Sequence, residues 1–238
     1  MKKKNRLIVV TGGSGRFGKI LREKKYPNFI FPSKKEMDIL RINSIEKYLK
    51  KIKPKTLIHL AGLSRPLTLH NERIDKSISL NIKGTCNLVI ICKKLNIKII
   101  YFSTSYVYPG KKGNYKESDP VLPSSNYAWS KLGGECAVRM YDNSLILRVC
   151  MTEKPFIHEA AFSDVKLNFI FHDDVAKILK KVVNKKGVLN IGGPTRTVYT
   201  FAKKYNPLVK KISSRSLKDI KFPKNLSMNL SKLNKIIN

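Results

Sequence analysis

Tyr127 and Lys131 stand four residues apart in a stretch typical of a helix, and three hydroxyl side chains, Ser103, Thr104 and Ser105, end an apolar run upstream of them. On a helix, residues with this spacing lie on one face. A phenol beside an ammonium group, with hydroxyls delivered from the end of a strand, can move a proton to or from a carbonyl oxygen. We therefore take these side chains as candidate catalytic groups.

The tyrosine–lysine spacing is not specific by itself, because Lys is abundant and three such pairs occur in the chain. The pair Tyr108 and Lys112 contains Pro109, which argues against a helix. The pair Tyr199 and Lys203 has no strand-end hydroxyls shortly before it. Only the pair at 127 and 131 follows such a strand end, so its context carries the catalytic interpretation.

A glycine-rich turn, Thr11-Gly12-Gly13-Ser14-Gly15-Arg16-Phe17-Gly18, lies between an apolar run at 6–10 and a short helical stretch that extends to about residue 25. Its glycines permit a tight turn and let a pyrophosphate approach the helix N-terminus, where free N–H groups and the helix dipole favour anions. The strand–turn–helix context strengthens a motif that is weak alone. The turn therefore predicts a dinucleotide site.

The residues after the next expected strand, at 28–31, indicate which dinucleotide is preferred. An acid at the end of this strand binds the ribose of NAD. Here the chain reads Ser33-Lys34-Lys35, with no acid before Glu36. Hydroxyl and ammonium groups suit a 2′-phosphate, so Ser33 and Lys34 predict a preference for NADP(H), with NAD(H) as the second choice.

Strand and helix patterns alternate along the chain, which predicts an α/β fold with a Rossmann-type doubly wound parallel sheet. Helices are expected at 16–25, 44–53 (with Ser44 as N-cap), 74–95, 127–140, 173–183 and 198–205, and strands at 6–10, 28–31, 56–62, 97–102, 144–149 and 187–191. We expect an NAD(P)-binding domain at 1–150 and a small, reduced C-terminal substrate-binding lobe at 151–238, with segments returning to the sheet. Ligands of such sheets bind at the carboxyl ends of the strands.

Composition excludes several other classes. The apolar fraction of 42% is that of a globular protein, and no apolar run has the roughly 20 residues that a membrane helix needs. The net charge of +32 invites a nucleic-acid interpretation, but Lys predominates over Arg and is spread along the whole chain, which favours a solvated surface. The four Cys fit no CxxC pattern, and the four His lack metal-site spacing. We expect reduced thiols, no metal, and a cytoplasmic protein.

The chain resembles the extended short-chain dehydrogenases/reductases, and within them it is most similar to the dTDP-4-dehydrorhamnose reductase group of nucleotide-sugar enzymes. The matching stretches follow the order of the family over nearly the whole chain. They are residues 11–18, 36–39, 60–62, 103–110, 117–119, 127–131, 134–135 and 227–233, together with Asn81 and Arg148.

This resemblance implies roles for individual residues. Tyr127 would donate a proton to a sugar keto oxygen, Lys131 would lower the phenol pKa and bind the nicotinamide ribose, and Thr104 would hydrogen-bond the reacting oxygen. The cofactor would contact Gly12, Gly15, Arg16, Phe17, Gly18, Asp38, Ile39, Leu60, Ala61, Gly62, Asn81 and Ser103 as well as Tyr127 and Lys131. The substrate would contact Ser105, Tyr106, Asn126 and Arg148.

The resemblance implies an NAD(P)-dependent oxidoreductase that reduces a 4-keto nucleotide sugar in deoxysugar or polysaccharide biosynthesis. One departure is Ser105, where the group usually has Asp. A nucleotide-sugar epimerase or dehydratase remains an alternative. Another is a non-catalytic NADP-binding regulatory subunit, because the Arg65-Pro66 loop is similar to that of the methionine adenosyltransferase beta subunit. Expected partners are a nucleotide sugar but neither nucleic acid nor membrane, and the chain could form a homodimer.

Overall fold

The computed structural model describes residues 7–156, 158–216 and 222–237. The chain divides into two compact units. The first comprises the chain up to Ser103 together with Trp129–Ile146 and Val183–Gly187. The second comprises Thr104–Ala128, Leu147–Val182 and the chain from Val188 onward.

A parallel sheet of six strands, in the order β10-β5-β4-β3-β1-β2, is the central element of the fold. Its strands are β1 (Ile8–Thr11), β2 (Phe29–Ile30), β3 (Thr56–His59), β4 (Lys98–Thr104), β5 (Ser144–Val149) and β10 (Gly187–Ile191). This arrangement confirms the predicted Rossmann-type α/β fold.

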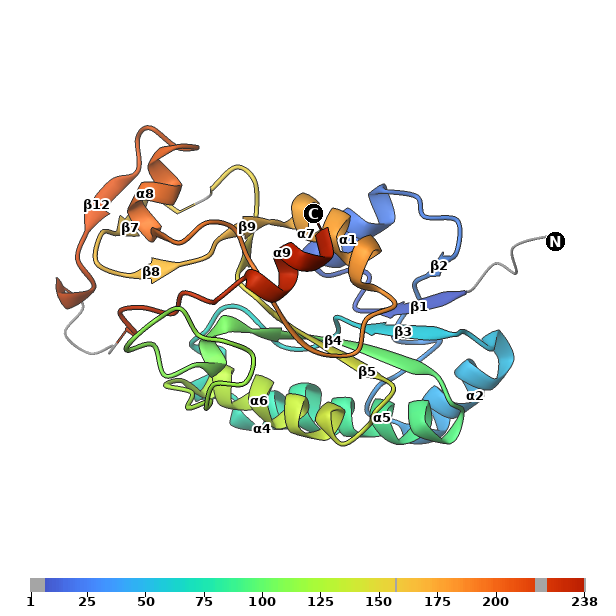
Figure 1. Ribbon diagram of the computed structural model, residues 1–238. Helices are drawn as coiled ribbons and strands as arrows, with labels where there is room; N and C mark the ends of the chain where they lie inside the picture. Colours follow the sequence, from blue (N-terminus) through green and yellow to red (C-terminus); the bar gives the residue numbers. More distant parts are fainter. Residues whose placement is uncertain (1–6, 157, 217–221, 238) are drawn as a thin grey trace. The chain divides into compact units, whose positions relative to one another are not determined.

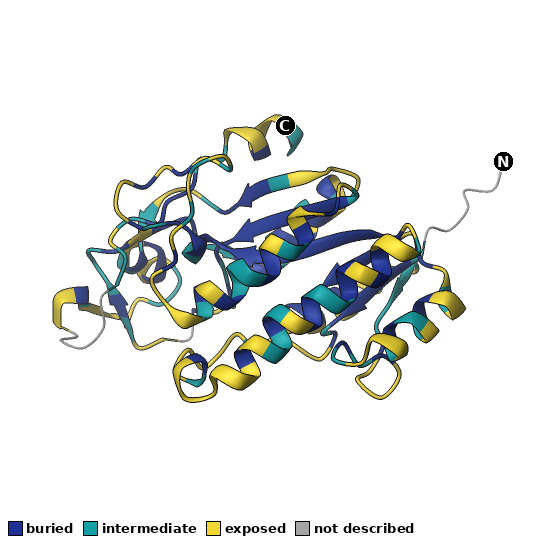
Figure 2. Cartoon of the chain, turned by 90° about the horizontal axis from the view of Figure 1, so that it is seen from below, coloured by how far each residue is buried: buried dark blue, intermediate teal, exposed yellow. Residues whose placement is uncertain are grey.

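The inner strands are buried along their whole length, which explains their nearly continuous Ile, Val and Leu sequence. Figure 2 shows them uniformly in the colour of buried residues. In the register of β1 and β3, Thr11 lies opposite His59, at the carboxyl ends of both strands. These two side chains therefore lie at the edge of the sheet where a ligand is predicted to bind.

Helices of the first unit cover both faces of its strands. In Figure 1, α2 (Ile42–Ile52) and α5 (Gly84–Lys94) lie along one face, and α1 (Arg16–Glu23) lies on the other. Helix α2 begins earlier than predicted, with Arg41 as its N-cap. Ser44 is not the cap, because its hydroxyl accepts a 3.0 Å hydrogen bond from the Asp38 N–H instead.

The helix predicted at 74–95 is interrupted. It consists of α4 (Ile74–Ser77), a π-helical segment at Ile78–Lys83 and then α5. A short helix, α3 (Leu69–Glu72), lies in the preceding segment, where the sequence predicts no regular element. π-Helical turns are frequent at functional sites, and this one carries Asn81.

Short strands and aromatic side chains build the second unit. Three two-stranded sheets pair β6 (Met151–Thr152) with β9 (Ile170–Phe171), β7 (Ala160–Phe162) with β12 (Lys210–Ile212), and β8 (Lys166–Leu167) with β11 (Arg196–Thr197). The helical segments are α7 (His172–Val182), α8 (Val198–Lys203), α9 (Ser231–Ile237) and two 3-10 turns at Ser105–Val107 and Ser214–Ser216. Phe201 contacts several rings, including those of Phe171 and Tyr205.

Helix α6 (Asn126–Arg139) contributes residues to both units, because Asn126, Tyr127 and Ala128 belong to the second unit and the rest to the first. Across the described residues, no helix combines the length and the apolar character that crossing a membrane requires. The same residues contain no cluster of three His, Cys, Asp or Glu side chains arranged to hold a metal ion.

Candidate active site

The glycine turn between β1 and α1 is packed so closely that two of its positions have no room for a side chain. Gly12 has a φ of +71°, and a Cβ there would lie 2.5 Å from the Ala61 nitrogen. A Cβ at Gly18 would lie 2.3 Å from the Gly12 carbonyl oxygen. The backbone of the turn thus lies directly against the segment that follows β3, as in a dinucleotide cradle.

The N-terminus of α1 is electrostatically suited to an anion. Gly15 is its N-cap, no side chain caps it, and its first turn holds no acidic residue. The first N–H groups of a helix lack intrahelical partners and carry a partial positive charge. The predicted residues Arg16 and Phe17 differ in environment: Arg16 donates a 3.3 Å bond to the Ser64 hydroxyl, whereas Phe17 is buried with its ring 5.2 Å from that of Phe102.

A buried histidine with a single consistent tautomer lies beneath this edge of the sheet. Thr85 donates its hydroxyl proton to the Asn81 carbonyl oxygen (2.7 Å), so it accepts from Nε2–H of His59 (3.0 Å). The remaining nitrogen, Nδ1, then accepts from the hydroxyl of Thr11 at 2.9 Å. Burial, and to a smaller extent the charge of Lys131, lowers the pKa of His59 to about 3. The ring is therefore neutral at physiological pH.

Thr11 also connects β1 to the predicted cofactor residues after β3. Its hydroxyl oxygen accepts 3.1 Å hydrogen bonds from the N–H groups of both Leu60 and Ala61. Next to them, the side chain of Asn81 bonds Leu63 through its Oδ1 (2.7 Å) and its Nδ2 (2.9 Å). A Cβ at Gly62 would lie 2.7 Å from this Oδ1, so Asn81 and the strand end fit together only with glycine there.

Lys131 lies on α6 in a desolvated and aromatic environment. Its ammonium nitrogen is 4.2 Å from the centre of the Tyr101 ring, and its main-chain oxygen accepts a 3.0 Å bond from the Tyr101 hydroxyl. Desolvation lowers the pKa of Lys131 to about 7, and the charge of Glu135 opposes that shift. Glu135 also accepts a 2.7 Å bond from Ser103, which ties α6 to β4. Ser103 thus has a positioning contact as well as its predicted cofactor role.

Thr104 and Tyr127 lie in the second unit. Thr104 is the last residue of β4, and its Oγ1 accepts a 3.3 Å bond from the Tyr106 N–H, which begins the 3-10 turn at Ser105–Val107. The ring of Tyr106 meets that of Tyr127 edge to face, with the centroids 6.4 Å apart. The unit therefore brings together two of the predicted residues, one assigned to substrate and one to catalysis. Asn126, assigned to substrate, is the first residue of α6.

Two residues predicted to bind substrate are instead completely buried. Ser105 has no exposed surface. It neighbours the Cys150 thiol, whose pKa burial raises to about 12 against the opposing effect of the Ser105 hydroxyl. Arg148 also has no exposed surface, and its Nη1 donates to Tyr108 (2.8 Å) and to the Glu117 carbonyl oxygen (3.2 Å). Both side chains face the protein interior in this structure, and their contact with a substrate stays a prediction.

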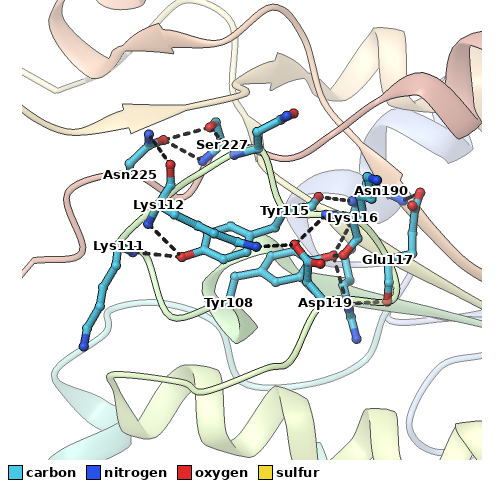
Figure 3. Close-up of polar contacts among 12 residues, drawn as sticks. Tyr108, Lys111, Lys112, Tyr115, Lys116, Glu117, Asp119, Asn190, Asn225 and Ser227 are labelled. Atoms are coloured by element: carbon cyan, nitrogen blue, oxygen red, sulfur yellow. Dashed lines mark hydrogen bonds and ion pairs between the residues drawn. The ribbon is translucent and has the colours of Figure 1, made fainter.

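Arg148 is one layer of a four-layer stack. Its guanidinium lies 4.8 Å from the centre of the Tyr108 ring, and that ring stacks on Tyr115 at 4.8 Å and 7°. The ammonium of Lys112 lies 5.5 Å from the Tyr115 ring on the outer side. Figure 3 shows the rings of Tyr108 and Tyr115 beside Asn190, whose side chain bonds the Tyr108 hydroxyl (2.8 Å) and the Tyr115 carbonyl (2.9 Å). The loop that follows β4 is therefore firmly held.

The predicted adenosine-side residues make local contacts. Asp38 accepts a 3.0 Å hydrogen bond from the Leu40 N–H. Ile39 is buried, and its side chain would lie 2.8 Å from a Cβ added at Gly84. Ser33 is engaged with Glu36, because its N–H donates to the Glu36 carboxylate (2.8 Å) and its Oγ accepts from the Glu36 N–H (3.3 Å). The side chain of Lys34 is exposed.

Several residues of this region were not anticipated from the sequence. They are Thr11, His59, Glu135, Tyr115 and Asn190, each of which contacts a predicted residue directly or through one intermediate side chain. The only available signal was position, since Thr11 and His59 end expected strands and Glu135 follows Lys131 by four residues. Tyr115 and Asn190 meet only through tertiary contacts.

The sequence model of the RmlD substrate binding domain matches residues 6–154. This chain belongs to the RmlD family. Every predicted site residue lies inside the matched range. The match covers the glycine turn, β4 with its strand-end hydroxyls, and the whole of α6.

The proteins similar to this chain include a reductase and a subunit beta of methionine adenosyltransferase 2. The chain is 26% identical to the dTDP-4-dehydrorhamnose reductase of Aggregatibacter actinomycetemcomitans over 199 residues, which are 79% of this chain and 62% of that one. It is 27% identical to the methionine adenosyltransferase 2 subunit beta of Pongo abelii over 144 residues, 56% of this chain and 43% of that one. The chain thus spans roughly half the length of these curated relatives.

Solved structures share the fold. The dTDP-4-dehydrorhamnose reductase of Bacillus anthracis in complex with NADP superposes with a TM-score of 0.87 at 22% identity, covering 97% of this chain and 92% of that one. The RmlD-type fold therefore extends beyond the range of the family match and includes the second unit.

Proposed function

We propose that this RmlD-family chain is an NAD(P)H-dependent reductase of a 4-keto nucleotide sugar, similar to dTDP-4-dehydrorhamnose reductase, in deoxysugar or polysaccharide biosynthesis. NADP(H) is the preferred cofactor. The observation that carries the proposal is that helix α6 bears Tyr127 and Lys131 one turn apart. The same chain has a glycine turn that packs against the segment after β3 with room only for backbone. The cofactor is assigned to residues 1–150 and the sugar to 151–238 with its returning segments.

Tyr127 is the proposed proton donor to the keto oxygen. An ordinary phenol has a pKa of about 10, so it needs a nearby cation to work near neutral pH. Lys131 supplies that charge, and its own pKa of about 7 means that an anionic ligand would raise its protonation at neutral pH. Thr104 hydrogen-bonds the reacting oxygen, and bound nicotinamide supplies the hydride.

The remaining proposed contacts follow the edge of the sheet. The N-terminus of α1, with Gly15 at its start, holds the pyrophosphate. Ala61 and Gly62 border the ribose side, where Thr11 fixes the backbone N–H of Ala61. Asp38 and Ile39 border the adenine.

The test is turnover by the purified chain with NADPH or NADH and a panel of 4-keto nucleotide sugars that includes dTDP-4-dehydrorhamnose. We expect the nicotinamide absorbance to fall with at least one sugar. Tyr199→Phe is the matched control for Tyr127→Phe, because Tyr199 and Lys203 repeat the tyrosine–lysine spacing on helix α8. Cofactor binding without turnover on any sugar of the panel would contradict the reductase assignment. Dinucleotide that co-purifies at full occupancy would favour an epimerase or dehydratase.

A second candidate function is a non-catalytic cofactor-binding subunit. It is favoured by the similarity to a methionine adenosyltransferase 2 subunit beta, which covers 56% of this chain. In that case Tyr127→Phe would leave function intact, and the chain would co-purify with an enzyme partner in stable stoichiometry. Measurable sugar reduction that Tyr127→Phe abolishes would exclude this function as the sole role.

A further inference from the structure

Arg22, near the C-terminal end of α1, folds back onto the two backbone segments that flank the adenosine side of the glycine turn. Its Nε–H donates a 3.0 Å bond to the carbonyl oxygen of Gly13 in the turn. Its Nη2 donates a 3.2 Å bond to the carbonyl oxygen of Phe31, directly after β2. The guanidinium also lies 4.8 Å from the centre of the Phe31 ring. Arg22 therefore connects the ends of two neighbouring strands.

The absence of a side chain at Gly13 makes this arrangement fit. A Cβ there would lie 2.9 Å from Arg22 Nε and 2.9 Å from the Phe31 ring. Two backbone hydrogen bonds and a cation–π contact hold the guanidinium although its residue is exposed to solvent. A side chain that is already held loses less conformational freedom when it binds a ligand.

Glu36, the first acidic residue after β2, does not take the place of Arg22 in recognising the adenosine ribose. Glu36 receives hydrogen bonds from the N–H of Ser33, which lowers its pKa, and the charge of Arg22 lowers that pKa further. The Ser33 hydroxyl oxygen accepts a hydrogen bond from the Glu36 N–H. An acid that is already bound by backbone and faced by a guanidinium competes weakly for ribose hydroxyls.

We propose that Arg22 binds the 2′-phosphate of NADP(H) and thereby sets the cofactor preference of this chain. In doubly wound folds the adenosine ribose lies between the glycine turn and the end of the second strand, and a nearby Arg accommodates the 2′-phosphate. Arg22 spans these two places and has three further N–H groups, in the planar geometry that matches a phosphate. The inference rests on the proposed dinucleotide function and moves the specificity from Ser33 and Lys34 to Arg22.

The experiment measures dissociation constants by calorimetry for NADPH, NADH and the fragments 2′,5′-ADP and 5′-AMP. Arg22→Gln is compared with Arg139→Gln, which removes one exposed charge at the end of α6, and with Lys34→Gln. We expect Arg22→Gln to weaken NADPH and 2′,5′-ADP by roughly tenfold or more, as for a lost bond to a charged group, and to leave NADH and 5′-AMP within about twofold. Arg139→Gln should bind like the wild type, and Lys34→Gln should weaken NADPH less than Arg22→Gln does.

The outcomes separate this inference from the proposed function. An equal loss of NADPH and NADH binding in Arg22→Gln overturns the inference, because it shows that Arg22 only shapes the turn. Arg22→Lys, which retains the charge without the fork, should bind NADPH with intermediate affinity, and a loss confined to Lys34→Gln also overturns the inference. Wild-type protein that binds both dinucleotides equally overturns the inference alone. Wild-type protein that binds neither overturns the proposed function as well.

Discussion

The guanidinium of Arg148 lies 4.8 Å from the centre of the Tyr108 ring and donates a 2.8 Å hydrogen bond from Nη1 to the hydroxyl of the same tyrosine. The two side chains are both completely buried. A buried arginine is costly unless its N–H groups are bonded, so this relationship holds the charge in the interior. Through Tyr115 and Asn190 it also fixes the loop that follows β4.

Tyr108→Phe should lower the free energy of unfolding by about 1–3 kcal/mol, because it leaves Arg148 and Asn190 without the hydroxyl that both of them contact. Chemical denaturation measures this loss. Tyr199→Phe is the matched control and should change stability by less than about 0.5 kcal/mol. Equal stability of the two variants would show that water replaces the hydroxyl and that the stack, not the bond, holds Arg148.

His59 should make the protein less stable in mild acid. Its folded pKa of about 3 lies below the ordinary value of 6.5, so between these limits the unfolded chain binds more protons. The contribution of His59 to stability is therefore complete above about pH 6.5. Below that pH the free energy of unfolding falls by up to roughly 1.4 kcal/mol for each pH unit. The measurement is the free energy of unfolding against pH. His59→Gln, which keeps an N–H toward Thr85, should flatten the curve; an unchanged slope would place the titration elsewhere.

Lys131 should make cofactor binding depend on pH near neutrality. Its pKa of about 7 means that the free protein loses this positive charge as pH rises through 7, so affinity for an anionic dinucleotide should decline above that pH. Calorimetry of NADPH binding over a range of pH tests this, and Lys131→Met should flatten the decline. Lys98→Met is the control, since burial lowers the pKa of Lys98 to about 8 but this residue begins β4, at the end opposite Thr104.

Tyr127→Phe should lower kcat by about 100- to 10,000-fold on the accepted sugar, because the proposed proton donor is removed while the ring remains. The dissociation constant of NADPH should change by less than about threefold. Steady-state kinetics and binding measured on the same preparation distinguish the two effects. A parallel loss of binding and turnover would show that Tyr127 shapes the cofactor site and does not donate the proton.

Gly12→Ala should destabilise the protein more than Gly187→Ala does. Both glycines have positive φ values, +71° and +84°, so each substitution carries a backbone penalty of roughly 1–2 kcal/mol. A Cβ at Gly12 would also lie 2.5 Å from Ala61, whereas a Cβ at Gly187 would meet nothing within 4 Å. Chemical denaturation of the pair isolates the effect of close packing. Equal losses would mean that the turn can relax away from β3.

Local patterns determined much of this molecule before any tertiary contact was considered. The apolar runs of β1, β3, β4 and β5 predicted a buried parallel sheet, because such strands are covered on both faces. The glycine spacing predicted the turn, and the helical period placed Tyr127 and Lys131 on one helix. These features depend on residues close in sequence, so the sequence contains the information directly.

Only the tertiary structure decided which side chains of these elements face inward. Ser105 and Arg148 are predicted from the sequence to contact the substrate, and both are buried because the 3-10 turn and β5 direct their side chains to the interior. Strands of two or three residues such as β6 and β8 are too short for a periodic signal, and the π-helical segment at Ile78–Lys83 carries no motif of its own.

The order of the strands in the sheet also determines which distant residues a side chain contacts. Arg22 reaches Gly13 and Phe31 because β1 and β2 are neighbours in the sheet, and His59 meets Thr11 because β1 and β3 are in register. The sequence by itself thus determined the elements and the chemical types at their ends. The tertiary structure decided which of these groups are held, buried or available, since that depends on contacts between residues far apart in the chain.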